Sequence, residues 1–426
     1  MGGSASGSAR LALLQERDRS QACPRTLKNG LTAGILCRSG PDAGVRQGFV
    51  QFCLSGLSHN ETGTGMQMLS VELKSPQTLS DEERAAWRGM LTSNPFLVSP
   101  YLMLGYVDAV SHARPDIKVA VIRRSDRIAG FFAFQKGPMG HARAPGGVVN
   151  DCHAVICAPG EDIALSHVLI QAGVEVFDFK DCLAAQAPFR RHAEFVEGGW
   201  IIDISDGFDA YVAQRKKPGG NTFRSAIGAP KKLAKEGELT FRFDDRRPET
   251  LEALYGWKSA QYRESGFPDL FALKWVRDLI EQLWRQERAD GAGLMSTLEL
   301  DGRLAAVHFG LIGPTVLHSW FPAYDPEFAH LTPGNALLIE MLQAGAEAGV
   351  REVHMGPGDQ RQKQAMGSFQ EGLATGCIAR PGLVGWARQA AGYIEKTAEP
   401  LPLGPLARAP GKAFRKIDRI AALYGV

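Results

Sequence analysis

The most regular pattern of apolar and polar positions lies in the last third of the chain. Residues 295–312 form two apolar runs around a Leu-Asp-Gly-Arg turn, which predicts a β-hairpin. A third strand is expected at 315–325. A helix is expected at 335–349, because apolar residues recur there at helical spacing. Residues 350–356 predict one more strand, so the order is hairpin, strand, helix and strand.

Pro333 and Gly334 stand where this helix should begin. A helix N-terminus that follows a strand presents unpaired backbone N–H groups and the positive end of the helix dipole. Both features suit a phosphate or pyrophosphate group. We therefore expect an anion-binding turn at residues 334–337.

The segment from residue 68 to residue 200 shows the same kind of pattern. Ser80 and Glu83 predict a capping box at the start of a helix, after a strand near 68–76. Residues 117–137 predict a hairpin with a polar turn. Residues 160–173 predict a helix that leads into another strand.

Two pairs of similar segments recur at one spacing. The string that begins at Arg127 resembles the string that begins at Arg303, and 303 − 127 = 176. The string that begins at Ala172 resembles the string that begins at Ala348, and 348 − 172 = 176 again. Two separate segments at a single offset indicate a duplicated unit. Chance similarity between short apolar strings is the alternative.

The two copies differ where their helices are expected to start. Glu161 and Asp162 follow the Pro-Gly pair of the first copy, and carboxylates in a first turn would satisfy the dipole and repel a pyrophosphate. Asn335 and Ala336 follow the Pro-Gly pair of the second copy. We therefore expect the second copy to bind an anionic group at its helix start. The first copy should be a degenerate partner that does not.

The approach to the second helix, AYDPEF…TPG, and the downstream GDxxxK resemble the C-terminal half of CelD-like proteins. These are GNAT acyltransferases, related to FemAB-like transferases with tandem GNAT domains. The resemblance implies an α/β (α+β) fold in which each domain is a mixed twisted sheet flanked by helices. It also implies an N-acyltransferase that moves an acyl group from acyl-CoA to a small amine, such as an amino sugar in polysaccharide biosynthesis. The chain departs from the family at Gln362, where the family often has tyrosine.

The resemblance also places the donor. It implies that the pyrophosphate of acyl-CoA lies over the helix start, with binding residues Tyr324, Pro333, Gly334, Asn335, Ala336 and Leu337. Backbone N–H groups of residues 317–323 are expected to polarise the thioester carbonyl.

Three side chains are candidates for the chemistry. Asp359, at the end of a predicted strand, is the first candidate for the base that takes the proton of the amine. Lys363 would pair with Asp359 or bind an anionic group, although both residues would also suit an exposed loop ion pair. His308 is the second candidate base, and its alternative role is structural. His318 and Trp320 share a strand face and either line the acyl slot or pack in the core.

Composition narrows the alternatives. The net charge of +2 does not argue for a nucleic-acid partner. The seven cysteines have no CxxC spacing and no His/Cys cluster, so neither a disulfide framework nor a metal site is expected. We expect a cytoplasmic protein, because the chain has no apolar run of membrane-spanning length and no secretory signal pattern. The basic stretch at 215–235 would hold an anionic acceptor, such as a sugar phosphate or tRNA, or form a solvated helix face.

These patterns predict four segments: a disordered or non-native extension at 1–67, a degenerate GNAT-like domain at 68–200, a GNAT acyltransferase domain at 201–385 and an amphipathic helical tail at 386–426. A regulatory or targeting role is the alternative for the extension. The tail would pack across the domain or contact membrane-bound polysaccharide synthesis machinery. The alternatives to an acyl-CoA-dependent enzyme are a catalytically silent scaffold and a FemAB-like transferase that uses aminoacyl-tRNA.

Overall fold

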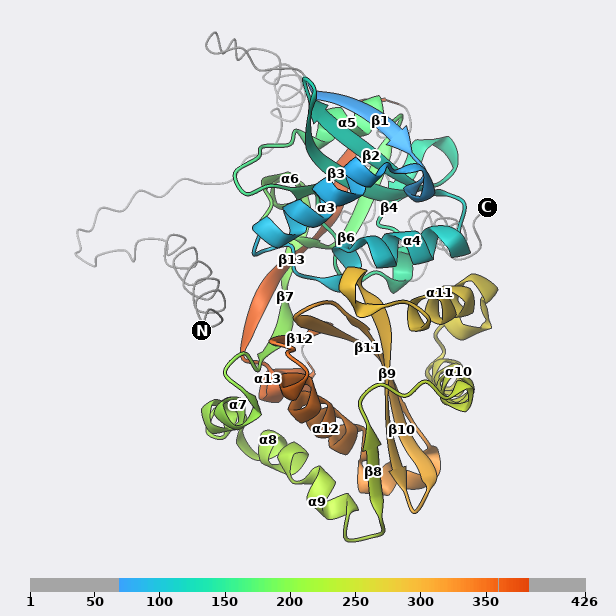
Figure 1. Ribbon diagram of the computed structural model, residues 1–426, viewed down its shortest axis with the longest axis vertical. Helices are drawn as coiled ribbons and strands as arrows, with labels where there is room; N and C mark the ends of the chain where they lie inside the picture. Colours follow the sequence, from blue (N-terminus) through green and yellow to red (C-terminus); the bar gives the residue numbers. More distant parts are fainter. Residues whose placement is uncertain (1–68, 359, 383–426) are drawn as a thin grey trace, which may run out of the picture. The chain divides into compact units, whose positions relative to one another are not determined.

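The computed structural model describes residues 69–358 and 360–382, whose strands join into one mixed sheet (Figure 1). The predicted extension, the predicted tail and Asp359 lie outside the described residues. Within the described part of the chain, no helix combines the length and the apolar character needed to cross a bilayer.

The described chain consists of two halves with a similar order of elements, apart from one extra strand in the first half and three extra helices at the start of the second. The first half contains β1 (Leu69–Lys74), α3 (Asp81–Ser93), α4 (Leu104–Ala113), β2 (Ile117–Arg124), β3 (Arg127–Lys136), β4 (His141–Arg143), β5 (Ile156–Cys157), α5 (Leu165–Gln171), β6 (Val176–Leu183), α6 (Ala187–Arg191) and β7 (Ala193–Asp203).

The second half begins with three short helices, α7 (Phe208–Arg215), α8 (Gly220–Ile227) and α9 (Ala229–Leu233). It continues with β8 (Leu239–Arg242), α10 (Pro248–Ser265), α11 (Lys274–Trp284), β9 (Ala292–Leu300), β10 (Arg303–Ile312), β11 (Val316–Tyr324), α12 (Pro333–Glu347), β12 (Glu352–Pro357), α13 (Arg361–Met366) and β13 (Phe369–Ala379).

The internal repeat is confirmed at the positions that predicted it. β3 begins at Arg127 and β10 at Arg303, which is 176 residues later, and both are second strands of a hairpin. β6 begins at Val176 and β12 at Glu352, again 176 residues apart. The chain is therefore a tandem of two α/β units of one design.

The last strand of each half is exchanged with the other half. The strand order is β1-β2-β3-β4-β6-β13-β7-β12-β11-β10-β9-β8, with β5 paired to β3. β13 lies between β6 and β7, and β7 lies between β13 and β12. Each half-sheet is thus completed by the strand that the other half contributes. This exchange was not predicted, and the predicted boundary at residue 200 falls inside β7.

Alternation along the strands divides the core between the two faces of the sheet. On β2, Val119 and Val121 pack with helices α3 and α4, whereas Ala120 and Ile122 pack with α5. The cluster on the α3–α4 face also contains side chains of α10 and α11, so one core serves both halves. α12 covers the opposite face of the second half, together with α7, α8 and α9.

The exchanged strands carry their side chains into the core of the other half. Ala374 and Ile378 of β13 belong to the α5–α6 core of the first half. Ile202 of β7 belongs to the core beneath α12. Neither half can bury its apolar face without the other.

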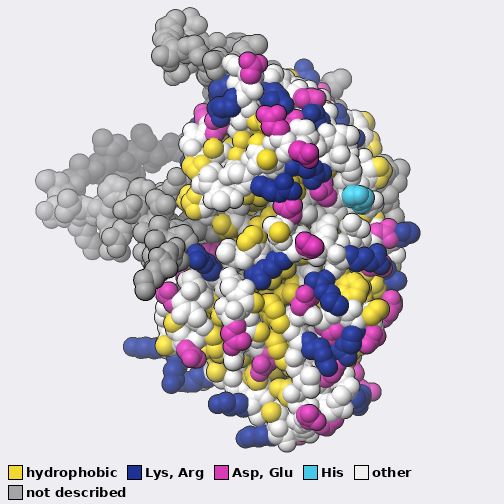
Figure 2. All heavy atoms as spheres, in the orientation of Figure 1, with side chains coloured by type: hydrophobic (Ala, Val, Ile, Leu, Met, Phe, Trp, Pro, Cys, Tyr) yellow, Lys and Arg dark blue, Asp and Glu magenta, His cyan; other side chains and the backbone are white. Residues whose placement is uncertain are grey.

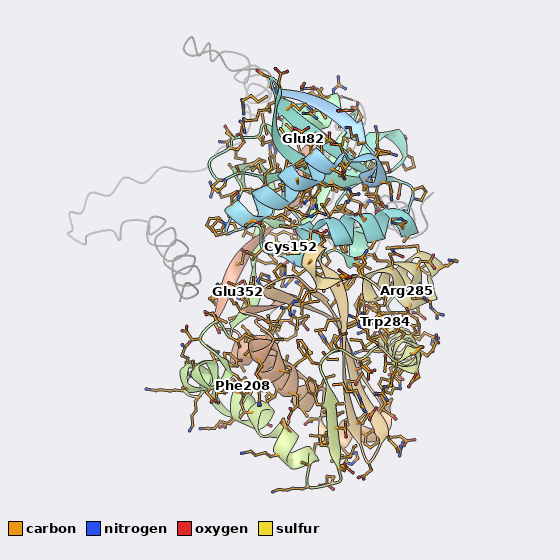
Figure 3. The ribbon with its side chains drawn as sticks, viewed as in Figure 1. Glu82, Cys152, Phe208, Trp284, Arg285 and Glu352 are labelled. Atoms are coloured by element: carbon orange, nitrogen blue, oxygen red, sulfur yellow. The ribbon has the colours of Figure 1, made fainter. Side chains whose placement is uncertain are left out.

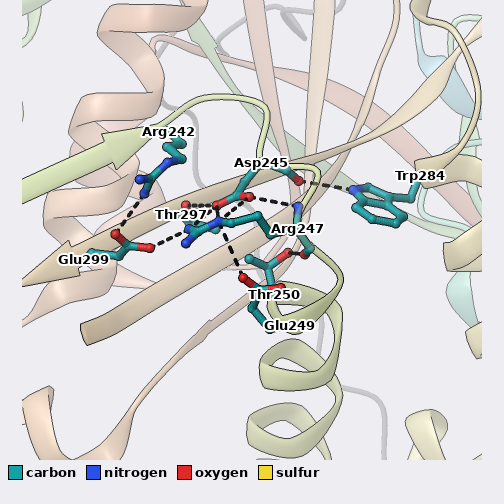
Figure 4. A network of polar contacts seen from close by, with 8 residues as sticks. All are labelled: Arg242, Asp245, Arg247, Glu249, Thr250, Trp284, Thr297 and Glu299. Carbon is teal, nitrogen blue, oxygen red and sulfur yellow. Dashed lines mark hydrogen bonds and ion pairs between the residues drawn. The ribbon is translucent and has the colours of Figure 1, made fainter. Parts of the chain in front are cut away.

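The start of α10 is held by a polar network (Figure 4). Arg247, the residue before α10, donates to the carboxylates of Asp245 at 2.6 Å and of Glu299 on β9. The hydroxyl of Thr297 donates to Asp245 at 2.7 Å, and the indole of Trp284 on α11 donates to the Asp245 carbonyl at 3.2 Å. The network therefore connects α10, α11 and β9.

One helix start was predicted wrongly. The sequence predicted a helix over 160–173 with Glu161 and Asp162 in its first turn, but α5 begins at Leu165. The carboxylate of Glu161 instead forms ion pairs of 3.0 Å with Arg124 and 2.7 Å with Arg127, at the turn of the β2–β3 hairpin. These two arginines, rather than a helix dipole, hold the carboxylate.

The exchange of strands generates a prediction about stability. Ile378→Ala should reduce the free energy of unfolding by about 2–5 kcal/mol, because it removes a buried side chain from the first-half core. Hydrogen exchange should accelerate at β6, whose Phe177 pairs with Ile378. Ile170→Ala, at an exposed site on α5, is the matched control and should have little effect. Faster exchange confined to the second half would contradict the interpretation.

Candidate active site

The N-terminus of α12 is open and carries no acidic residue in its first turn. The helix begins at Pro333, after Thr332 in the left-handed region with φ of 55°. A Cβ placed on Gly334 would meet only the ring of the half-exposed Tyr324, at 4.0 Å. The side-chain oxygen of Asn335 accepts a hydrogen bond of 2.7 Å from Gln362 of α13. The N–H groups of Asn335 and Ala336 donate to the Thr332 carbonyl at 3.1 and 3.4 Å, so the space for an anion lies beside the N–H of Gly334.

The sheet forks between β11 and β12. The two strands are parallel neighbours, but they pair only where Val316, Leu317 and His318 lie opposite residues 352–354. Beyond His318, β11 runs on to Tyr324 with β10 on its other side. His318 therefore lies at the branch point, on the same strand that leads to the N-terminus of α12.

A small pocket lies at this fork. It is lined by β7, β11, β12 and β13 and by a loop of the first half, through residues that include Asp151, Trp200, His318, His354 and Glu371. Cys152, which follows Asp151, lies where the two halves meet (Figure 3). Because β7 and the loop belong to the first half, both halves build the pocket.

The His318 ring is the most enclosed titratable group of the pocket. Its side chain is 2% exposed, and neither ring nitrogen has a hydrogen-bond partner among the described residues. Its Nε2 lies 3.5 Å from the carboxylate of Asp151, and its ring lies edge-on to Tyr101 at 4.9 Å. Burial lowers the pKa of His318, and the negative charge of Asp151 opposes that effect.

The charge of Asp151 is maintained by its neighbours. Although burial raises the pKa of Asp151, its interactions with His318 and with the ammonium groups of Lys180 and Lys363 outweigh that effect and lower the pKa. Asp151 is therefore a carboxylate at neutral pH. It is also the more accessible member of the pair, since its side chain is 31% exposed.

Comparison with known proteins gives one family match, which lies in the second half. Residues 221–364 match the family model described as an acetyltransferase (GNAT) domain. This segment is therefore similar to GNAT acetyltransferase domains. No curated protein sequence matches the chain.

Several solved structures have a similar fold. One is the C-terminal domain of a putative lysylphosphatidylglycerol synthetase from Agrobacterium fabrum, which is 11% identical to this chain and has a TM-score of 0.46. The alignment covers 73% of this chain and 97% of that chain. A tandem GNAT protein from the clavulanic acid biosynthesis pathway has 12% identity and a TM-score of 0.44, and the alignment covers 74% of this chain and 100% of that chain. FemX has 11% identity, a TM-score of 0.47 and coverage of 65% and 90%. At these TM-scores, none of the similarities bears on activity.

Two of the predicted catalytic residues, Asp359 and Lys363, follow shortly after β12, which is one of the two strands that form the fork. Asp359 lies outside the described residues, so its role as a base stays a prediction. Lys363 on α13 donates a hydrogen bond of 2.6 Å to the carbonyl of Pro357, at the end of β12. Burial lowers the pKa of Lys363, and nearby carboxylates, among them Asp151, oppose that effect.

His308, the third predicted catalytic residue, lies inside the core. Its Nε2 is 2.9 Å from the hydroxyl of Ser319, and its side chain is buried. Burial lowers the pKa of His308 to about 3, so the ring is neutral at physiological pH and only weakly basic. Its role as a base also stays a prediction, and its position is less favourable for that role than the position of His318.

The predicted donor-binding residues converge on one place. Tyr324 lies beside the Gly334 position, and Pro333, Asn335, Ala336 and Leu337 follow along the first turn of α12. Ala336 and Leu337 are buried against α9, so only their backbone groups can face a ligand.

The pair formed by Asp151 and His318 was not predicted. The two residues lie 167 positions apart, and neither stands in a motif that points to the other.

The low pKa of His308 predicts how stability depends on pH. In the unfolded chain the ring is protonated below about pH 6.5, whereas in the folded protein it stays neutral down to about pH 3. The unfolded state therefore binds the extra proton, and stability should fall between pH 6.5 and pH 3 by up to about 1.4 kcal/mol per pH unit. Urea unfolding at pH 7.5, 6 and 5 should show a shallower decline in His308→Gln than in the wild type. His330→Gln, at an exposed site, should keep the wild-type slope, and equal slopes in all three proteins would contradict the assignment.

Proposed function

We propose that the protein is an N-acyltransferase that transfers an acyl group from acyl-CoA to an amine. The observation that supports this most is the open, carboxylate-free first turn of α12, within the segment that matches the GNAT acetyltransferase family. GNAT domains use acyl-CoA, and its pyrophosphate would accept a hydrogen bond from the N–H group of Gly334.

The geometry of β11 supports this orientation of the donor. Tyr324 lies beside the α12 N-terminus and His318 lies at the fork, six residues earlier on the same strand. A strand advances about 3.3 Å per residue, so these positions are roughly 20 Å apart. An extended phosphopantetheine arm spans a distance of this order, and it would bring the thioester close to the fork.

The reaction requires little from the protein beyond placement. The acceptor nitrogen must be neutral, the thioester carbonyl must be polarised, and the two must be aligned. Beyond His318, β11 no longer pairs with β12, so backbone N–H groups on that edge would be available to polarise the carbonyl. This is the role that the sequence analysis proposed for residues 317–323. The amine would enter from the pocket that both halves line.

The resemblance to CelD-like proteins supports an amino sugar of polysaccharide biosynthesis as the acceptor. The first half would then act as the degenerate partner, since its α5 does not begin at the Pro-Gly pair and its Glu161 is bound by two arginines. We also propose a cytoplasmic location, which the supply of acyl-CoA would require.

One observation favours a second donor, aminoacyl-tRNA. Figure 2 shows Lys and Arg side chains along the part of the surface where α7, α8 and α9 lie. The exposed basic residues there are Lys216, Lys217, Arg224, Lys231, Lys232 and Lys235. α9 packs against the first turn of α12, so this basic surface is next to the proposed donor site. Binding of a tRNA that competes with CoA would favour this donor.

Substitutions in the first turn of α12 test the proposal. Asn335→Asp keeps the side-chain oxygen that Gln362 contacts but adds a negative charge, and should weaken CoA binding by about 0.3–1 kcal/mol. Gly334→Glu adds both charge and bulk and should weaken binding further. Gly89→Glu, at an exposed helix position of α3 with nothing within 4 Å, is the matched control and should bind CoA normally.

Calorimetric titration with CoA and acetyl-CoA provides the measurement. Equal affinities in all four proteins would contradict the proposed donor site. A wild type that binds neither ligand, and that releases no thiol from acetyl-CoA with any amine, would favour the catalytically silent scaffold.

A further inference from the structure

Residues that line the pocket at the fork carry buried polar atoms with no hydrogen-bond partner in the described part of the chain. They include Nδ1 of His318 and the indole Nε1 of Trp200, on β7, whereas Nε2 of His318 has the carboxylate of Asp151 at 3.5 Å. Leaving such groups unpaired is unfavourable, because they lose their hydrogen bonds to water on burial. Buried polar atoms without a partner, on residues that line one pocket, are what a binding site shows when a ligand supplies the missing partners.

The nearest charge to these atoms comes from the first half. Asp151 lies in the loop before β5, and its carboxylate is 3.5 Å from Nε2 of His318. That separation is longer than a typical N–H···O hydrogen bond, so the interaction between the two groups is mainly electrostatic. The other nearby charges have partners of their own: Lys363 donates to Pro357, and Lys180 pairs with Asp181 at 2.8 Å.

We propose that Asp151 and His318 together bind the acceptor amine, so that the first half supplies one of the two groups that prepare it for acylation. This inference rests on the proposed function and adds the acceptor site to it. The carboxylate of Asp151 attracts the amine as an ammonium ion, because it is charged and accessible. His318, directly behind it, takes the proton.

The steps balance in atoms and charge. The ammonium ion passes one proton to Nε2 of His318 and becomes a neutral amine, and Asp151 stabilises the imidazolium that forms. The amine lone pair attacks the thioester carbonyl, the C–N bond forms, and the C–S bond breaks. The departing thiolate takes the second proton of the nitrogen and leaves as a free thiol. His318 then releases its proton to solvent, and the products are an amide, a thiol and one proton.

Trp200 indicates the class of acceptor. The indole N–H is a donor only, so its partner must be a hydrogen-bond acceptor such as a hydroxyl or ether oxygen. An amine bound at Asp151 should therefore also carry an oxygen atom, as amino sugars and amino alcohols do. A simple alkylamine would leave the indole unpaired and should be a poorer substrate.

The first test uses glucosamine and acetyl-CoA as probes with the full chain. Asp151→Asn keeps the shape of the side chain and removes its charge, so the KM for glucosamine should rise about tenfold or more, as expected when a charge-assisted contact is lost. Acetyl-CoA binding should not change. Asp178→Asn is the matched control, because Asp178 forms another Asp–His pair, 2.8 Å from His141, away from the fork. It should leave the KM at the wild-type value.

The second test separates the base from a structural histidine. His318→Gln should reduce kcat by about 10²–10⁴, the range expected for loss of a general base. In Asp151→Asn the imidazolium loses its counter-charge, so the acid limb of the kcat/KM profile should move to lower pH. The groups that face His318 and remain in that variant are Tyr101, His308, His354 and Lys363.

The outcomes distinguish this inference from the proposed function. An active wild type whose Asp151→Asn variant has an unchanged KM and an unchanged acid limb would overturn the inference alone. So would a wild type that binds CoA but neither binds nor acetylates glucosamine. A wild type that binds no CoA would overturn the proposed function. Near-equal kcat/KM values for butylamine and glucosamine would overturn the role of Trp200.

Discussion

The exchange of last strands between the halves is the constraint on which the structure depends. β13 lies between β6 and β7, and β7 lies between β13 and β12, so every half-sheet has a neighbour from the other half. The apolar side chains of these strands cross with them, as Ile378 and Ile202 show. Since burial of apolar surface is the main favourable term in folding, the two halves form a single thermodynamic unit.

The same exchange positions the pocket. β7 and β13 bring Trp200 and Glu371 next to β12, and the loop that carries Asp151 packs against the fork between β11 and β12. A single copy of the repeated unit would have the fork but not the carboxylate or the indole. The first half, although it lacks a helix start suited to a pyrophosphate, therefore contributes side chains that the second half does not have.

Much of the local structure could be predicted from the sequence alone. The Asp301-Gly302 turn has both φ angles positive, as a two-residue hairpin requires, and α12 follows the predicted apolar spacing. The repeat at an offset of 176 predicted equivalent strands correctly. These features depend on residues close together in the chain, or on direct similarity between two strings.

Contacts between distant residues could not be predicted in this way. The start of α5 was wrong because Arg124 and Arg127, on a hairpin more than thirty residues earlier, hold Glu161. Asp151 and His318 lie close together only because of how the two halves join. The spacing of residues along the chain gives no sign of this contact. The exchange of strands could not be predicted from the sequence either. β7 and β13 have apolar and polar residues in a pattern that would suit an edge strand of either half-sheet.

The strand order also has a consequence for synthesis of the chain. β6 ends at Leu183, and the strand that pairs with it, β13, begins at Phe369. A ribosome adds about 5–20 residues per second, so the β13 edge of β6 waits roughly 10–40 s for its partner. During that interval the nascent chain presents an unpaired strand edge, the kind of surface that recruits other strands. The time needed to translate residues 184–368 therefore sets how long this edge stays unpaired.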